Sequence, residues 1–296
     1  MTPTPATIEK REALLAFIGS VLQADLAVRA VIGIGSIATG LCRPDSDIDA
    51  VIFLDPFDWY IVPAESTWRP SDGTFHSIFT QADWVAQEGV QLDFARCDLK
   101  QWADPAFTWP EGRRAELAEG WLAFARTGAV AKLIAERTDY GEGIRVARLD
   151  EAITWLDQHL GRAVTEEKWA TLGPVIAHHR LQAAYDYLVQ ALFAYNRRWR
   201  PWYNREMSYL LRLPWLPPDF APHVLSAANP PGLDLAGYLA RYERLHTLFG
   251  QLLARLQADG DYGPDPIGEA FIRRAEEPGR SWNMAEWKQK HAQRVG

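Results

Sequence analysis

The chain has 296 residues, of which 48% are hydrophobic, so it can bury a large core and form two domains. Its formal net charge of −7 argues against a general nucleic-acid binder, which needs a basic face. Cys42 and Cys97 lack metal-ligand spacing and suit a reducing compartment. Because no signal-peptide pattern and no apolar run of membrane-spanning length is present, we expect a cytoplasmic protein without membrane contacts.

The first half of the chain predicts a small α/β domain. Its pattern begins with an amphipathic helix and continues with short β-branched runs bounded by turn residues. Strands are expected over residues 31–34, 47–54, 73–80, 90–95 and 121–126, helices over 7–23, 81–87 and 129–136, and a Pro- and Trp-rich loop over 55–70. We therefore predict a small mixed sheet in a first domain over residues 1–143.

After residue 144 the pattern becomes helical. Proline clusters fall between the helical segments, where they end one helix and precede the next. Long helices are expected over residues 149–160, 172–195, 203–213 and 233–258, and a short one over 267–275. These segments predict an antiparallel helical bundle over 144–260, followed by a C-terminal helix and polar tail over 261–296. The predicted fold class is α+β followed by all-α.

Two acidic residues stand at the start of the second predicted strand, shortly after a glycine–serine pair. Gly35 and Ser36 follow the first strand and lead into a short helical turn, whose free backbone N–H groups can hold a phosphate. Asp47 and Asp49 lie two apart on a strand, so their side chains share a face while Ile48 points into the core. Adjacent carboxylates repel each other unless a cation lies between them. This pattern favours Mg²⁺ together with the triphosphate of a nucleotide.

The motif resembles that of the DNA polymerase β-like nucleotidyltransferase superfamily, which combines Gly-Ser, a short spacer and Asp-x-Asp on a strand. That superfamily has a third carboxylate on a later strand, and Asp93 fits it here. The pairing of this domain with a helical bundle resembles kanamycin-type aminoglycoside nucleotidyltransferases. The resemblance is specific over residues 33–54 and only architectural after residue 145.

The resemblance implies nucleotidyl transfer with two Mg²⁺ ions and ATP or another NTP as donor. It implies that Asp47 and Asp49 bind both ions, and that Asp93 completes one metal site or accepts the acceptor's proton. Gly35 and Ser36 would contact the phosphates. Arg43 is a further candidate for the triphosphate, whereas the residues that follow it, Asp45 and Ser46, are expected to shape the turn.

A second candidate segment, residues 195–206, is dense in arginine, aromatic and amide side chains. Such a mixture suits phosphate contacts and stacking, and we favour Arg205 as its nucleotide-binding residue. An interdomain hinge, in which arginine packs on tryptophan, is an equal alternative. Glu206 and Asp186 are further candidates for the general base that activates the acceptor.

We expect an enzyme that transfers a nucleoside monophosphate, most simply AMP, to a small hydroxylated acceptor such as an aminoglycoside-like antibiotic. The expected partners are a nucleoside triphosphate and a small molecule, without nucleic acid. Two alternatives remain open: an antitoxin-type enzyme that adenylylates a protein, and a non-catalytic nucleotide-binding regulator. The sequence decides neither the acceptor, the base preference nor the oligomeric state.

Overall fold

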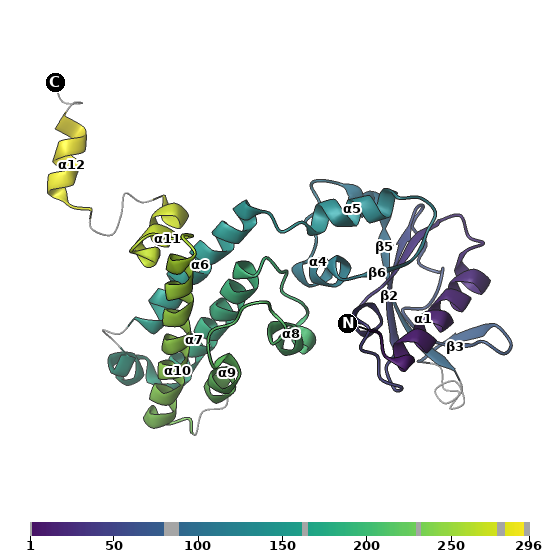
Figure 1. The fold of residues 1–296 in the computed structure, drawn as a ribbon, viewed down its shortest axis with the longest axis horizontal. Coiled ribbons are helices and arrows are strands. Elements are labelled where there is room, and N and C mark those ends of the chain that lie inside the picture. Colours follow the sequence, from purple (N-terminus) through teal and green to yellow (C-terminus); the bar gives the residue numbers. More distant parts are fainter. Residues whose placement is uncertain (1, 80–88, 162–164, 229–231, 277–281, 293–296) are drawn as a thin grey trace. The chain divides into compact units, whose positions relative to one another are not determined.

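A computed structural model describes residues 2–79, 89–161, 165–228, 232–276 and 282–292. The chain divides into two compact units, Met1–Asp139 and Tyr140–Gly296. The first unit contains a mixed sheet and the second is helical, as the fold class predicted from the sequence requires (Figure 1). Each unit is described by itself below.

The first unit is built on a six-stranded sheet with the strand order β4-β3-β5-β2-β1-β6. Parallel pairing joins β2 to β5, while the other neighbouring strands are antiparallel. The strands are β1 (Val28–Gly33), β2 (Ile48–Leu54), β3 (Glu65–Arg69), β4 (Thr74–Ser77), β5 (Val90–Asp98) and β6 (Trp121–Ala125). The central strands β1, β2 and β5 are the most apolar, because both of their faces are covered.

Helices cover both faces of this sheet (Figure 1). Helix α1 (Pro5–Phe17) continues into the π-helical turn η1 (Ile18–Leu22) and packs on the face that carries Ile52 and Phe94. The opposite face carries Val51 and Phe53. It packs against the helical elements that follow β5, namely α3 (Leu99–Ala103), α4 (Glu111–Ala118) and α5 (Ala129–Thr138).

The prediction of one continuous loop over residues 55–70 is wrong, because β3 lies within it. This strand is short, and its buried Trp68 packs edge-on against Phe17 of α1 at a centroid distance of 5.4 Å. Tertiary packing therefore overrides the loop signal of the surrounding prolines. Helices α3 and α4 were also not expected, and the helix predicted over residues 81–87 lies outside the described residues.

The second unit consists of helices. Its core is formed where α6 and α10 pack against α7, and α9 and α11 pack against α10 and α6 respectively (Figure 1). The helices are α6 (Glu142–Leu160), α7 (Thr165–Tyr195), α8 (Tyr203–Leu210), α9 (Phe220–Ala228), α10 (Leu235–Ala258), α11 (Pro266–Ala275) and α12 (Met284–His291). A kink interrupts α7 at Gly173, which has a φ of 76° and directly precedes Pro174. None of the described helices is both long and apolar enough to cross a bilayer.

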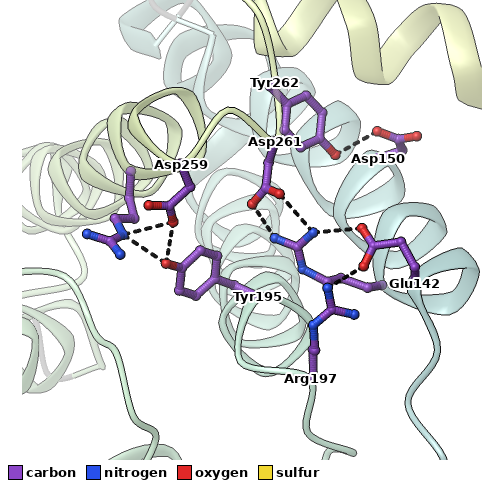
Figure 2. Close-up of polar contacts among 9 residues, drawn as sticks. Glu142, Asp150, Tyr195, Arg197, Asp259, Asp261 and Tyr262 are labelled. Atoms are coloured by element: carbon purple, nitrogen blue, oxygen red, sulfur yellow. Dashed lines mark hydrogen bonds and ion pairs between the residues drawn. The ribbon is translucent and has the colours of Figure 1, made fainter.

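Ion pairs hold the start of α6 to the turn between α10 and α11 (Figure 2). Arg145 is buried and donates to both carboxylate oxygens of Asp261 and to Glu142. Arg197, just beyond α7, forms an ion pair with the same Glu142. Nearby, the hydroxyl of Tyr195 donates to Asp259 at 2.6 Å. Glu142 thus forms ion pairs with both Arg145 and Arg197.

A third contact brings α11 onto α6. Asp150 is 4% exposed, and its carboxylate accepts hydrogen bonds from the Tyr262 hydroxyl (2.7 Å) and from Arg273 (2.8 and 2.9 Å). Residues 261–276 thus pack as part of the helical unit. Helix α6 also begins earlier than the predicted residue 149, and helices α9 and α12 were not expected.

Candidate active site

A glycine-bounded turn follows β1 and forms one end of the candidate site. Gly35 has a φ of 65° and Gly40 a φ of 81°, values that glycine adopts without strain. Between them, Ser36–Thr39 form the single helical turn α2. We call Gly35–Gly40 the cradle. Its first backbone N–H groups have no partner within so short a helix, as phosphate binding by Gly35 and Ser36 would require.

Strand β2 places the first two acids beside the cradle. The N–H of Ile34, at the end of β1, donates to the carbonyl oxygen of Asp49 at 2.9 Å. Asp47 directly precedes β2, and Ile48 between the two acids is fully buried. Ile48 points into the core that α1 covers. Because side chains alternate along a strand, Asp47 and Asp49 point to the opposite face of the sheet.

The third predicted acid lies next to the first two. In the parallel pair of β2 and β5, Asp49 is directly opposite Asp93. Side chains that are opposite each other on neighbouring strands share a face of the sheet. The structure thus brings Asp49 and Asp93 together, with Asp47 one side-chain step along the same face.

A fourth acid, Glu65, was not identified from the sequence. In the antiparallel pair of β3 and β5, Glu65 is directly opposite Asp93. Asp49, Asp93 and Glu65 therefore form a row across three adjacent strands, which we call the acid row. Nothing local in the sequence indicates this, because the register of β3 is set by its pairing with a strand far along the chain.

Electrostatics agree with this placement. The pKa of Asp93 is raised, first by burial and then by repulsion from Asp49, Glu65 and Asp47. The nearby charge of Arg113, on α4, acts in the opposite direction. A carboxylate whose pKa is raised by burial and by neighbouring negative charges is stabilised in its ionised form by a bound cation.

The donor set fits Mg²⁺ that arrives with a nucleotide. Within the described ranges, no group of three or more His, Cys, Asp or Glu side chains is placed to hold a metal ion by itself. Mg²⁺ is commonly held by one or two carboxylates, with substrate phosphates and water as its other ligands. Asp49 and Asp93, which are directly opposite each other, could supply such carboxylates to a metal ion that a nucleotide brings.

Comparison with known proteins identifies this part of the chain. The family of the nucleotidyltransferase domain matches residues 16–96, which include the cradle and the acid row. We call residues 16–96, the part of the first unit that this family matches, the nucleotidyltransferase domain. A nucleotidyltransferase-like protein from Exiguobacterium sibiricum 255-15 has a solved structure that resembles this chain at 12% identity, over 93% of this chain and 84% of that one, with a TM-score of 0.40. No curated protein matches the sequence.

The turn before the acids of the nucleotidyltransferase domain is shaped by its own side chains, as predicted. The hydroxyl of Ser46 accepts a hydrogen bond from the backbone N–H of Arg43 at 3.0 Å. Asp45 pairs with the guanidinium of Arg43 at 3.1 Å, and both side chains are largely exposed. Arg43 is thus engaged within its own turn, and a triphosphate contact would require it to leave Asp45.

A cavity of about 540 Å³ lies in the first unit, and none of the side chains of the acid row lines it. Thr67 and Gln91 line it, and they pair with each other one side-chain step along β3 and β5 from Glu65 and Asp93. Its other lining residues come from α1, the turn before β2 and the strand ends: Glu9, Lys10, Ala13, Pro44, Asp45, Ser46, Ile78, Gly89 and Val90. The volume is in the range of small-molecule sites, and polar and apolar side chains both contribute.

Arg205 belongs to the helical unit, and so does the whole of residues 195–206. Several charged groups of this segment are engaged inside that unit. Arg200 pairs with Glu206, which is 4% exposed, and with Asp186 at 3.4 Å. Trp199 packs on Tyr140 at a centroid distance of 4.6 Å. These contacts give most of the segment a packing role within the helical unit.

Proposed function

We propose that the chain is a Mg²⁺-dependent nucleotidyltransferase that moves AMP from ATP to a hydroxyl group of a small acceptor and releases pyrophosphate. The observation that carries the proposal is the in-register pairing of Asp49 with Asp93 beside the cradle. The family of the matched domain supports nucleotide transfer in general. The choice of AMP and the small acceptor are our own extension.

In the proposed reaction, the acceptor oxygen forms a bond to the α-phosphorus, and the bond from that phosphorus to the pyrophosphate oxygen breaks. Two bound Mg²⁺ ions would stabilise charge on the attacking and leaving oxygens. Asp47 and Asp49 would hold the metal ions of the triphosphate, and the backbone N–H groups of the cradle at Gly35 and Ser36 would bind its phosphates. Asp93 takes the proton that the acceptor hydroxyl loses.

The strand order supports a placement of the two substrates on opposite sides of Asp93. The cradle follows β1, and the order β1-β2-β5-β3 places Glu65 on the far side of Asp93 from the cradle. In-line displacement needs the attacking hydroxyl and the leaving pyrophosphate on opposite sides of the α-phosphorus. We therefore assign the Glu65 side to the acceptor.

A small polyhydroxylated cation suits that side best. Glu65 adds negative charge there, and Thr67 and Gln91, which pair one side-chain step along the same two strands, offer hydrogen-bonding groups. An aminoglycoside-like antibiotic, the acceptor suggested by the sequence resemblance, combines both properties. Arg205 remains a candidate for contact with the nucleotide, and testing it requires its own variant.

The deciding experiment measures Mg²⁺-dependent pyrophosphate release from ATP, GTP, CTP and UTP with pools of aminoglycosides, lincosamides and common metabolites. We expect release that depends on one acceptor pool and is lost in Asp49→Asn. Asp98→Asn is the matched control: Asp98 lies at the end of the same strand as Asp93 and caps α3, a role that asparagine also fills. If no pool supports pyrophosphate release although the protein binds MgATP, the proposal of a small-molecule acceptor is contradicted. Failure to bind any nucleotide would contradict the proposed function itself.

A further inference from the structure

Helix α1 holds the cradle from outside through a guanidinium group. Arg11 donates from Nε to the carbonyl oxygen of Ile37 at 3.0 Å and from Nη2 to that of Ala38 at 3.1 Å. The same guanidinium lies over the ring of Trp121 on β6, with 4.8 Å to the ring centroid. Arg11 thus links α1, the cradle and the edge of the sheet.

The carbonyl groups of the cradle need such a partner. Within the turn, the carbonyl oxygen of Gly35 accepts from Thr39, and that of Ser36 accepts from Leu41. The following carbonyls, of Ile37 and Ala38, are those that Arg11 binds. A single helical turn is not stable alone, because the conformational entropy lost in forming the first turn exceeds the stabilisation by its one hydrogen bond.

Two threonines at the start of α1, the N-cap Thr4 and Thr7 in its first turn, hold the chain just after the cradle. Thr4 donates from its hydroxyl to the carbonyl oxygen of Cys42 at 2.8 Å, and its backbone N–H donates to Gly40 at 3.0 Å. The hydroxyl of Thr7, which is fully buried, accepts from the N–H of Cys42 at 3.0 Å. The start of α1 therefore fixes both the turn and its exit.

We propose that Arg11 is a positioning residue for the triphosphate. Its guanidinium donates hydrogen bonds to two carbonyl groups at the C-terminal end of the turn, so in this role it does not itself contact phosphate. Arg11 holds the turn in the orientation in which the N–H groups at its start point toward the phosphates. Its positive charge also complements the negative end of the turn. This inference rests on the proposed function, since it assigns a role within the same nucleotide site.

The test compares Arg11→Met with Arg126→Met. Arg126 has the same kind of contacts elsewhere in this unit: it donates to the backbone carbonyls of Val28 (2.7 Å) and Gln23 (2.7 Å) and lies over Phe124 at 5.5 Å. The probes are MgATP and magnesium tripolyphosphate, measured by titration calorimetry, with thermal melting of each variant. Tripolyphosphate is included because it binds through the phosphate site alone.

We expect both variants to melt earlier, and only Arg11→Met to bind tripolyphosphate and MgATP about tenfold more weakly, the loss of one charged hydrogen-bonding group. Arg11→Lys keeps the charge but not the two-carbonyl geometry, and we expect it to bind tripolyphosphate more weakly than wild type as well. This second variant also covers the case in which Arg11→Met does not fold.

Unchanged tripolyphosphate affinity in a folded Arg11 variant, or an equal loss in Arg126→Met, would overturn the positioning role while leaving the proposed function intact. If the wild-type protein binds neither probe, the proposed function fails and the role of Arg11 fails with it. A loss of melting temperature in Arg11→Met with wild-type affinity for both probes would reduce Arg11 to a structural residue.

Discussion

Glu65 on β3 is directly opposite Asp93 on β5, on the strand side away from Asp49. This pairing gives Asp93 an acidic neighbour on each side, and both neighbours contribute to its raised pKa. The acid row is therefore wider than the Asp-x-Asp motif alone would make it. We propose that Glu65, its outer member, contacts the acceptor, whereas Asp49 and Asp93 act on the nucleotide and its metal ions.

Replacement of Glu65 by glutamine should weaken binding of the acceptor and leave binding of the nucleotide unchanged. With an aminoglycoside identified as substrate, we expect a roughly tenfold higher KM for that acceptor, because a charged contact is lost, and an unchanged KM for ATP. Steady-state kinetics with each substrate varied in turn measures both constants. Glu12→Gln, on the exposed surface of α1, is the control. A rise in the KM for ATP alone would place Glu65 with the nucleotide.

Asp93→Asn should stabilise the metal-free protein at neutral pH. Because the pKa of Asp93 is raised above its ordinary value of 3.8, ionisation of this group opposes folding: its contribution is most favourable below pH 3.8 and is lost as pH rises through the raised pKa. Asparagine cannot ionise, so the variant avoids that loss. Thermal melts with EDTA, from about pH 4 to pH 8, should show the variant melting higher at the upper end only.

Added Mg²⁺ and ATP should reverse this order. The wild-type protein gains stability from a ligand that binds its folded state, whereas Asp93→Asn has lost a carboxylate of the proposed metal site. If the variant gains as much from MgATP as the wild type does, Asp93 is not part of that site. Pyrophosphate release should fall by roughly 10²–10³-fold in the same variant, the usual cost of a group that acts on the transition state.

Gly35→Ala should disturb nucleotide binding directly. With a φ of 65° at this position, an alanine is strained by about 1–2 kcal/mol, and the turn will shift to relieve the strain. We expect weaker binding of MgATP in calorimetry. Gly128→Ala is the matched control, since Gly128 precedes α5 at a φ of −71° and an added Cβ there meets no atom within 4 Å. Equal effects of the two substitutions would count against a special conformation at Gly35.

The helical unit should lose stability in mild acid because of His159. Burial, followed by repulsion from Arg180 and Lys168, lowers the pKa of His159 to about 4 from an ordinary value of 6.5. The neutral ring stabilises the fold fully above pH 6.5, and this contribution is lost as pH falls from 6.5 toward 4. His159→Phe keeps an aromatic ring next to Trp155 and Tyr187 and cannot be protonated.

Thermal melts across that pH range should therefore fall less steeply for His159→Phe than for the wild type. The control is His246→Phe, another histidine that packs on an aromatic ring, Tyr242, in the same unit. The difference between the two variants isolates the part of the slope that belongs to His159. A wild-type slope in His159→Phe would show that its protonation does not limit stability.

The strand that carries Asp49 could be predicted from its continuous apolar run over residues 50–54, and the strand that carries Asp93 from the alternation of apolar and polar residues around it. Their exact register, and the identity of Glu65 as a neighbour, could not be predicted, because pairing between distant strands leaves no local pattern. Helix α6 was predicted too short, since Gly143 and the charged Glu142 and Arg145 obscure its first turns. There, the ion pairs with Asp261 and Arg197 decide the structure. The roles of the acids, of Ser36 and of Arg205 stay predictions.

From the contact of Asp150 with Arg273 we expect an order of folding events during synthesis of the chain. The first unit has its own core and ends at Asp139, so it can fold while the rest is still being translated. The helical unit cannot neutralise its buried Asp150 until Arg273 has left the ribosome. A nascent chain stalled near residue 260 would thus carry a finished nucleotidyltransferase domain beside a helical segment that still exposes apolar surface, and that interval is when a chaperone would be needed.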